Sequence, residues 1–86
     1  MYVILVYDMD ASRCTKMLKL CRKYLNWIQN SVFEGEMTGV QLKALKYEAS
    51  EIMDGNDSLI IFKNRDQKWL EKEIIGEEKS SIDNFI

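Results

Sequence analysis

The feature that most constrains the fold is a run of apolar residues at the start of the chain. Residues 2–7 are all aliphatic or aromatic, and several are β-branched. A short apolar run without alternation is typical of a strand that is buried on both faces in the middle of a sheet. The run ends at Asp8, so the sequence predicts a central strand over Tyr2–Tyr7 that is followed directly by a carboxylate.

Two later segments carry the spacing of amphipathic helices. From Ser12 onward, apolar residues recur every three or four positions, and Asp10 or Ser12 is the predicted N-terminal cap. Thr38 followed by Gln41 fits a capping box, and apolar residues again repeat at helical spacing until Gly55 provides a stop. The sequence therefore predicts one helix after the first strand and a second helix that begins at Thr38.

Further strands are predicted between and after these helices. Trp27–Glu36 is rich in aromatic and β-branched residues but interrupted by polar ones, which indicates one bent strand or two short ones with the bend at Asn30. Ser58–Phe62 follows a predicted turn as another apolar strand. Residues 69–75 are compatible with a short helix that runs into an edge strand, and the tail at 82–86 keeps apolar residues of the kind that often dock on another surface.

This order of elements predicts an α+β sandwich in which two helices cover one face of an antiparallel sheet. We expect a ferredoxin-like fold as one domain over residues 1–86, because the length leaves no room for a second domain. A chain this short has a thin core, so we also expect a homodimer.

The compartment follows from what the sequence lacks. Asp8 and Asp10 break the apolar start of the chain, and we recognise neither a signal peptide nor a membrane span. Cys14 and Cys21 lie too far apart along a helix to form a disulfide, so both are predicted to be buried thiols. We expect a cytoplasmic protein.

Composition excludes several kinds of chemistry. The chain has no histidine, so a Ser-His-Asp triad, a Cys-His pair and a His-containing zinc site are excluded. The net charge is -2, so any site for a polyanion must be local. The first predicted helix offers such a site, although a solvated helix face explains its charges equally well. Its cations are Arg13, Lys16, Lys19, Arg22 and Lys23.

Carboxylates gather where the first strand ends. Asp8 and Asp10 would point to the same side of an extended chain, and Mg²⁺ is commonly held by one or two carboxylates with waters and phosphate oxygens. A two-fold axis would add a second Asp8. The alternative is that Asp10 only caps the helix and Asp8 only ends the strand. Glu34 and Glu36 share a strand face and are candidates to join Asp8 as acid-base or metal groups.

Two segments resemble the signatures of a known family. Residues 1–8 and residues 29–36 look like the two signatures of the CRISPR-associated Cas2 family, the small protein of spacer acquisition. The order of the predicted elements matches too, so the resemblance covers essentially the whole chain. It implies a ferredoxin-like βαββαβ homodimer with an additional C-terminal strand, near Ile74 and Ile75, that completes the sheet of the partner.

The resemblance also implies a nucleic-acid site. Asp8 from both subunits would meet at the dimer cleft, as the catalytic residue and as a ligand of Mg²⁺ or Mn²⁺, for endonuclease cleavage of RNA or DNA. The positions that the family associates with its cleft and its substrate contacts are occupied here by Tyr7, Arg13, Lys16, Ser31 and Phe33. Lys16 stands where an arginine is common and keeps only the charge. From residue type alone, Trp27 and Phe33 would stack on bases if exposed, although aromatic residues in strands more often belong to the core.

In the family that this chain resembles, the better-supported role is that of a scaffold. There the dimer bridges two dimers of the Cas1 integrase and helps to hold a DNA duplex for insertion into the CRISPR array. Two hypotheses follow for this chain: a scaffold of spacer acquisition with Cas1 and duplex DNA as partners, and a metal-dependent endoribonuclease or endodeoxyribonuclease. The alternative without a nucleic-acid role is a ferredoxin-like dimeric interaction module.

Overall fold

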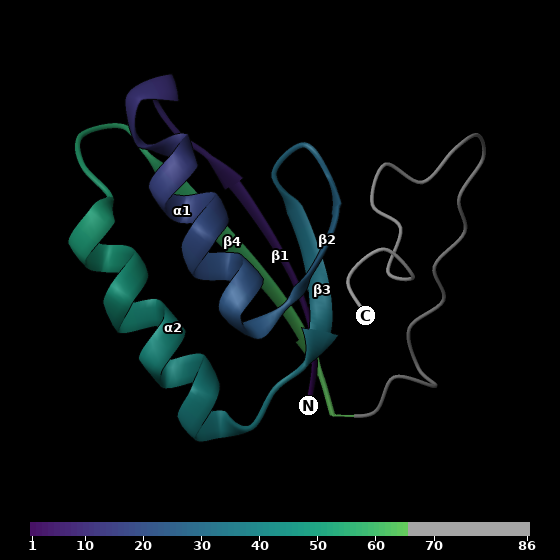
Figure 1. Ribbon diagram of the computed structural model, residues 1–86. Helices are drawn as coiled ribbons and strands as arrows, with labels where there is room; N and C mark the ends of the chain where they lie inside the picture. The colour runs from purple at the N-terminus through teal and green to yellow at the C-terminus, as the bar shows by residue number, and fades with distance from the viewer. Residues whose placement is uncertain (66–86) are drawn as a thin grey trace.

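Two helices lie on one face of a four-stranded antiparallel sheet in the computed structural model, which describes residues 1–65 (Figure 1). The elements are β1 (Tyr2–Asp8), α1 (Ala11–Tyr24), β2 (Asn26–Gln29), β3 (Val32–Glu36), α2 (Gly39–Ile52) and β4 (Ser58–Asn64). The strand order β2-β3-β1-β4 confirms the predicted ferredoxin-like α+β sandwich. The predictions for residues 69–75, for the additional strand and for the tail at 82–86 lie outside the described residues.

β1 is a central strand, as predicted, because it pairs with both β3 and β4. Its side chains alternate between the two faces of the sheet. Val3, Leu5 and Tyr7 face the helices and are buried, whereas Ile4 and Val6 on the other face are only half-buried. On that other face Tyr2 is buried as well, so the predicted burial on both faces is complete beneath the helices and partial on the side away from them (Figure 1).

α1 begins as the sequence suggested. The carboxylate of Asp10 accepts a hydrogen bond from the backbone N–H of Ser12 at 3.3 Å, so Asp10 is the cap of the two candidates. Cys21 is buried, as predicted, and burial raises the pKa of its thiol to about 12. Cys14 is only half-buried, because it lies at the margin of the core and donates to the carbonyl oxygen of Met9 at 3.6 Å.

The segment between the helices consists of two short strands, one of the two predicted possibilities. β2 and β3 pair with each other as a hairpin, with an irregular register between Trp27 and Gln29. Asn30, the predicted bend, lies in the turn with φ 45°. Asparagine tolerates this left-handed conformation better than most residues, so it permits the tight reversal.

α2 carries the predicted capping box. The N–H of Gln41 donates to Thr38 Oγ1 at 3.0 Å, and Gln41 Oε1 accepts from the N–H of Thr38 at 2.9 Å. The helix ends at Ile52, before the predicted stop, and Gly55 lies in the following turn with φ 54°. β4 continues beyond the predicted strand because its pairing with β1 extends to Asn64.

The core lies between the sheet and the helices. Its largest fully buried side chains are Phe33, Leu5, Met17, Leu45, Val3 and Cys21. Within residues 1–65, none of the helices has the length and apolarity needed to cross a membrane. Within residues 1–65 no helix lies over the opposite face of the sheet, and this asymmetry leaves that face as a candidate surface for partners.

Candidate functional site

Asp8 lies at the carboxyl end of β1, opposite Ser58 of β4, and its side chain is exposed. The alternation of β1 places it on the same face as Ile4 and Val6, away from the helices. Among residues 1–65 its carboxylate takes part in no hydrogen bond or ion pair. Asp8 is therefore the carboxylate of this region that is available to an external ligand.

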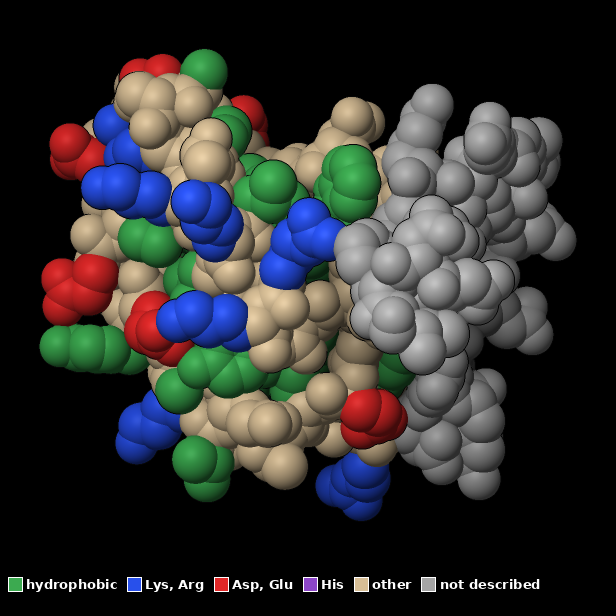
Figure 2. Space-filling view, viewed as in Figure 1, with side chains coloured by type: hydrophobic (Ala, Val, Ile, Leu, Met, Phe, Trp, Pro, Cys, Tyr) green, Lys and Arg blue, Asp and Glu red, His purple; other side chains and the backbone are tan. Residues whose placement is uncertain are grey.

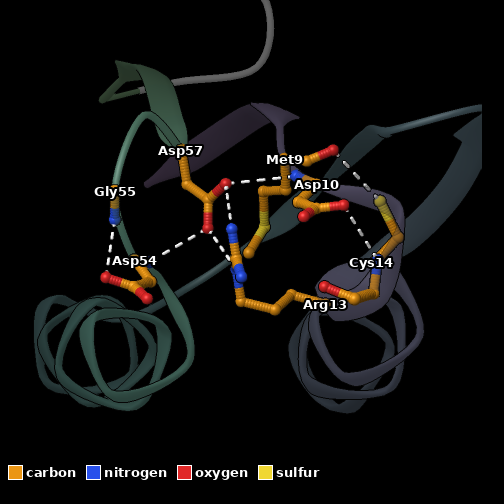
Figure 3. A network of polar contacts seen from close by, with 8 residues as sticks. Met9, Asp10, Arg13, Cys14, Asp54, Gly55 and Asp57 are labelled. Carbon is orange, nitrogen blue, oxygen red and sulfur yellow. Dashed lines mark hydrogen bonds and ion pairs between the residues drawn. The ribbon is translucent and has the colours of Figure 1, made fainter.

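Asp57 organises the loops around Asp8, and sequence reasoning missed it. Its carboxylate accepts from Arg13 Nε at 2.6 Å and Arg13 Nη2 at 3.0 Å, and also from the backbone N–H of Asp10 at 3.1 Å and of Asp54 at 2.9 Å (Figure 3). The hydrogen bonds from Arg13 are the main reason that the pKa of Asp57 lies well below its usual range. The loop before α1 is thereby tied to the loop before β4.

Arg13, a predicted nucleic-acid contact, is committed to this network. Its guanidinium holds Asp57 through two hydrogen bonds, and the Asp57 side chain is 3% exposed. This bidentate contact occupies guanidinium N–H donors that would otherwise be available to bind a phosphate. The structure thus gives Arg13 a role in positioning the loops, while contact with nucleic acid stays a prediction.

Glu34 and Glu36 do not join Asp8 within one chain. They pair with Ile4 and Tyr2, toward the other end of β1, so Glu34 lies about 13 Å along the strand from the level of Asp8. Glu34 is buried and accepts a hydrogen bond from the Tyr2 hydroxyl. Glu36 pairs with the N-terminal amine at 3.2 Å.

Tyr7 and Ser31 come together at a pocket between α1 and the β2–β3 hairpin. The backbone N–H of Tyr7 donates to the Ser31 carbonyl oxygen at 3.2 Å. Both residues line a pocket of about 350 Å³ with Thr15 and Leu18 of α1 and Trp27 of β2, which we call the hairpin pocket. Because Tyr7 faces the helices and Asp8 faces away from them, these two predicted site residues lie on different faces of the sheet.

Phe33 supports this pocket from inside the core. Its ring is fully buried and stacks on the ring of Tyr7, with centroids 6.0 Å apart and an interplanar angle of 24°. A fully buried ring has no face left for a nucleobase. Of the two aromatic residues considered for stacking, Trp27 is only half-buried and is the one that a ligand can reach.

The cations of α1 form a surface along that helix (Figure 2). Lys23 pairs with Glu48 of α2 at 3.3 Å. Lys16 and Lys19 are exposed and border the groove between α1 and α2. The predicted contact Lys16 is therefore accessible to a phosphate backbone, unlike the guanidinium of Arg13.

One chain offers a single carboxylate for a metal ion at this site. No group of three Asp, Glu or Cys side chains placed to hold a metal occurs within residues 1–65. Asp10 caps α1 and Asp57 holds Arg13, which leaves Asp8. Mg²⁺ is commonly bound by one or two carboxylates with waters and phosphate oxygens, so Asp8 fits as one ligand of a site that needs a second group.

Comparisons with known proteins agree with this fold. The sequence model of the family described as CRISPR associated protein Cas2 matches residues 1–72. A Fusobacterium nucleatum protein named CRISPR-associated endoribonuclease Cas2 is 46% identical over 92 residues, which cover 100% of this chain and 87% of that protein.

Solved structures give the same result. One named crystal structure of cas2 has a TM-score of 0.81 and 38% identity, and the match covers 95% of this chain and 93% of that chain. Streptococcus pyogenes Cas2 at pH 6.5 has a TM-score of 0.73 and 26% identity, over 86% of this chain and 99% of that chain.

Removing the hydroxyl group should have opposite effects on stability at the two buried tyrosines, Tyr2 and Tyr7. Tyr2→Phe takes a donor from the buried Glu34, so it should lower the free energy of unfolding by about 1–3 kcal/mol. Tyr7→Phe removes a buried hydroxyl that has no hydrogen-bond partner within residues 1–65, so stability should stay equal or rise. Urea denaturation at pH 7 measures the free energy of unfolding of both variants. A larger loss for Tyr7→Phe than for Tyr2→Phe would contradict the assignment of the hydrogen-bonded hydroxyl to Tyr2.

The Asp57 network predicts a dependence of stability on pH. Because the folded-state pKa of Asp57 is lowered, its contribution is complete above the unfolded pKa of about 4 and is lost as the pH falls below that value. Asp57→Asn should therefore lower the melting temperature at pH 7, and the difference from the wild type should shrink toward pH ~2.5. Asp54→Asn is the control, since among residues 1–65 its carboxylate accepts a hydrogen bond only from the neighbouring Gly55 N–H. A constant difference across the acid range would refute this role of Asp57.

Proposed function

This chain belongs to the CRISPR-associated Cas2 family, and we propose that it acts as a homodimeric scaffold of spacer acquisition that bridges the Cas1 integrase and holds duplex DNA. The observation that carries the proposal is the apolar face of the sheet that neither described helix covers. A scaffold of this kind needs a stable dimer and a surface for the phosphate backbone. The structure offers a candidate for each.

The dimer surface is the open face of β1 and β4. Ile60 and Phe62 of β4 are 51% and 58% exposed. They pair in register with Val6 and Ile4 of β1, so four apolar side chains lie next to one another on this face. Adjoining exposed apolar side chains mark association surfaces, and a second copy of the chain satisfies such a surface through a two-fold axis.

Asp8 lies on the same face, at the end of the strand that carries Ile4 and Val6. A two-fold axis close to this end of β1 would bring two copies of Asp8 near each other. The dimer would then supply the second carboxylate that a single chain lacks. Dimerisation and the proposed acidic cleft thus depend on the same face of the sheet.

The nucleic-acid surface is α1. Lys16 and Lys19 are exposed there, on a chain whose net charge is -2. Contacts from such lysines to phosphates release counterions, so binding should be local and should weaken as salt is raised. Arg13 contributes by fixing the start of α1 through Asp57.

A second candidate function is metal-dependent cleavage of RNA, which the name of the Fusobacterium relative favours. Asp8 from each subunit would hold Mg²⁺ or Mn²⁺ together with substrate phosphate oxygens. Such an ion lowers the pKa of a bound water and neutralises charge on the phosphate, which makes a histidine base unnecessary. Within this chain, the Asp57 network would keep the loop after Asp8 in place.

If the dimer forms through the open face of the sheet, a charged side chain placed on that face should weaken it. Phe62→Asp places a carboxylate among the apolar side chains, so it should shift the chain from dimer to monomer in sedimentation equilibrium. Val40→Asp on α2, a residue that is 81% exposed, is the matched control and should leave the mass unchanged. A Phe62→Asp protein that stays dimeric would show that the chains associate elsewhere.

The scaffold hypothesis and the nuclease hypothesis differ at Asp8. In cells that carry the matching integrase, Phe62→Asp should abolish spacer acquisition, whereas Asp8→Ala should leave it intact. With the purified protein and Mg²⁺, Asp8→Ala should abolish any cleavage of RNA. Loss of acquisition in Asp8→Ala, with the dimer intact, would favour the nuclease over the scaffold.

DNA retention tests the surface of α1. The double variant Lys16→Glu and Lys19→Glu should weaken duplex binding and reduce its salt dependence by about one unit per lost phosphate contact. Lys43→Glu with Lys46→Glu makes the same change of charge on exposed positions of α2 and should bind more tightly than the α1 variant. Equal losses in both variants would mean that net charge alone governs binding.

A further inference from the structure

The hairpin pocket contains a buried hydroxyl that has no partner. Tyr7 is 6% exposed, lines the pocket and has no hydrogen bond to its hydroxyl within residues 1–65. A buried polar group without a partner destabilises the fold, and native structures rarely keep one. A ligand that brought a hydrogen-bonding group into the pocket would remove this cost.

Trp27 gives the pocket a rigid aromatic wall. Its indole N–H donates to the Asn30 carbonyl oxygen at 2.8 Å, and Asn30 lies in the hairpin turn with φ 45°. The ring is therefore held by the turn. An aromatic surface that is already fixed loses little conformational entropy when a flat group stacks on it. Leu18 of α1 adds an apolar side chain to the same pocket.

The lining selects an uncharged ligand group. All the described residues that border the pocket are uncharged, and the hydroxyls of Thr15 and Ser31 add further donors and acceptors to that of Tyr7. Its volume of about 350 Å³ lies near the lower end of the range for small-molecule sites, about 300–1,000 Å³. That volume is enough for one nucleobase with part of its sugar.

Cations lie near the pocket without lining it. Arg22 follows Leu18 by four residues and so lies on the same side of α1, whereas Lys19 borders the groove between α1 and α2. Lysine and arginine side chains are spread over this part of the surface, with hydrophobic side chains among them (Figure 2). A neutral flat site beside positive charges matches a nucleobase with its phosphate.

We propose that the hairpin pocket receives one unpaired base of a single-stranded nucleic acid, with the base on Trp27 and a polar edge at the Tyr7 hydroxyl. This inference rests on the proposed nucleic-acid function and adds to it a site on the helix side of the sheet, separate from Asp8. Such a site would hold the end of a strand or a splayed nucleotide. Duplex contacts on α1 need no base pocket.

The fluorescence of Trp27 tests the site directly. Trp69→Phe leaves Trp27 as the only tryptophan of the chain. This protein is titrated with a single-stranded hexanucleotide and with an abasic hexamer that carries the same phosphates. The proposal predicts that the base-bearing strand changes Trp27 fluorescence and binds more tightly, whereas the abasic strand binds weakly through charge and leaves the fluorescence unchanged.

Tyr7→Phe tests the polar contact in the same background. It removes only the hydroxyl and should weaken the base-bearing strand by about threefold to tenfold, with no change for the abasic strand. Ser50→Ala, which removes an exposed hydroxyl of α2 away from the pocket, is the matched control and should bind both strands like its parent. The abasic strand separates a lost base contact from a general loss of folding.

The other outcomes are distinct. Equal binding of both strands without a Trp27 signal would overturn the base site and leave the proposed nucleic-acid function standing. Failure of the parent to bind either strand or duplex DNA would overturn both. A Trp27 signal that arises only when the integrase protein is added, without nucleic acid, would assign the pocket to a protein side chain and overturn the inference.

Discussion

The rest of the structure depends on one constraint: the central strand β1 is apolar on both sides, and the helices within residues 1–65 cover only one of them. Val3 and Leu5 of β1 are buried under the two helices, whereas Ile4 and Val6 point the other way. β4 extends that second surface with Ile60 and Phe62. Because apolar area in water is unfavourable, the same strand that organises the core also calls for a partner on its other face.

The long-range contact of Asp57 has a different consequence. It accepts hydrogen bonds from Arg13, 44 residues away in sequence, and from the loop that follows Asp8. The start of α1 is thus fixed relative to the ends of β1 and β4. The hydrogen bonds of Asp57 thus hold the loop after Asp8 and the start of the cationic helix in one arrangement.

Local patterns predicted most of the fold. The apolar run of β1, the Thr38–Gln41 capping box and the turn at Asn30 each depend on near neighbours in sequence, so they could be read directly. The resemblance also marked Asp8, Tyr7 and Ser31, but it could not say which face of the sheet each one occupies. Alternation along β1 puts Asp8 and Tyr7 on opposite faces of the sheet, but only the position of the helices shows which of these faces is covered.

Other features depend on contacts between distant segments. Nothing in the turn that contains Asp57 indicates that its carboxylate binds Arg13, and nothing in residue type shows that Phe33 is fully covered while Trp27 is not. Glu34 and Glu36 lie two residues apart and so share one face of β3, yet the antiparallel register places them toward the end of β1 that is far from Asp8. These outcomes are set by strand pairing and packing.

The central claim is that two copies of this chain form the core of an acquisition complex. Multi-angle light scattering on the wild-type chain, mixed with the Cas1 integrase of the same genome and a short DNA duplex, tests it most directly. The account predicts a defined particle, larger than either protein alone, whose mass includes two copies of this chain. Separate peaks for the integrase and for this chain, with no shared particle, would contradict it.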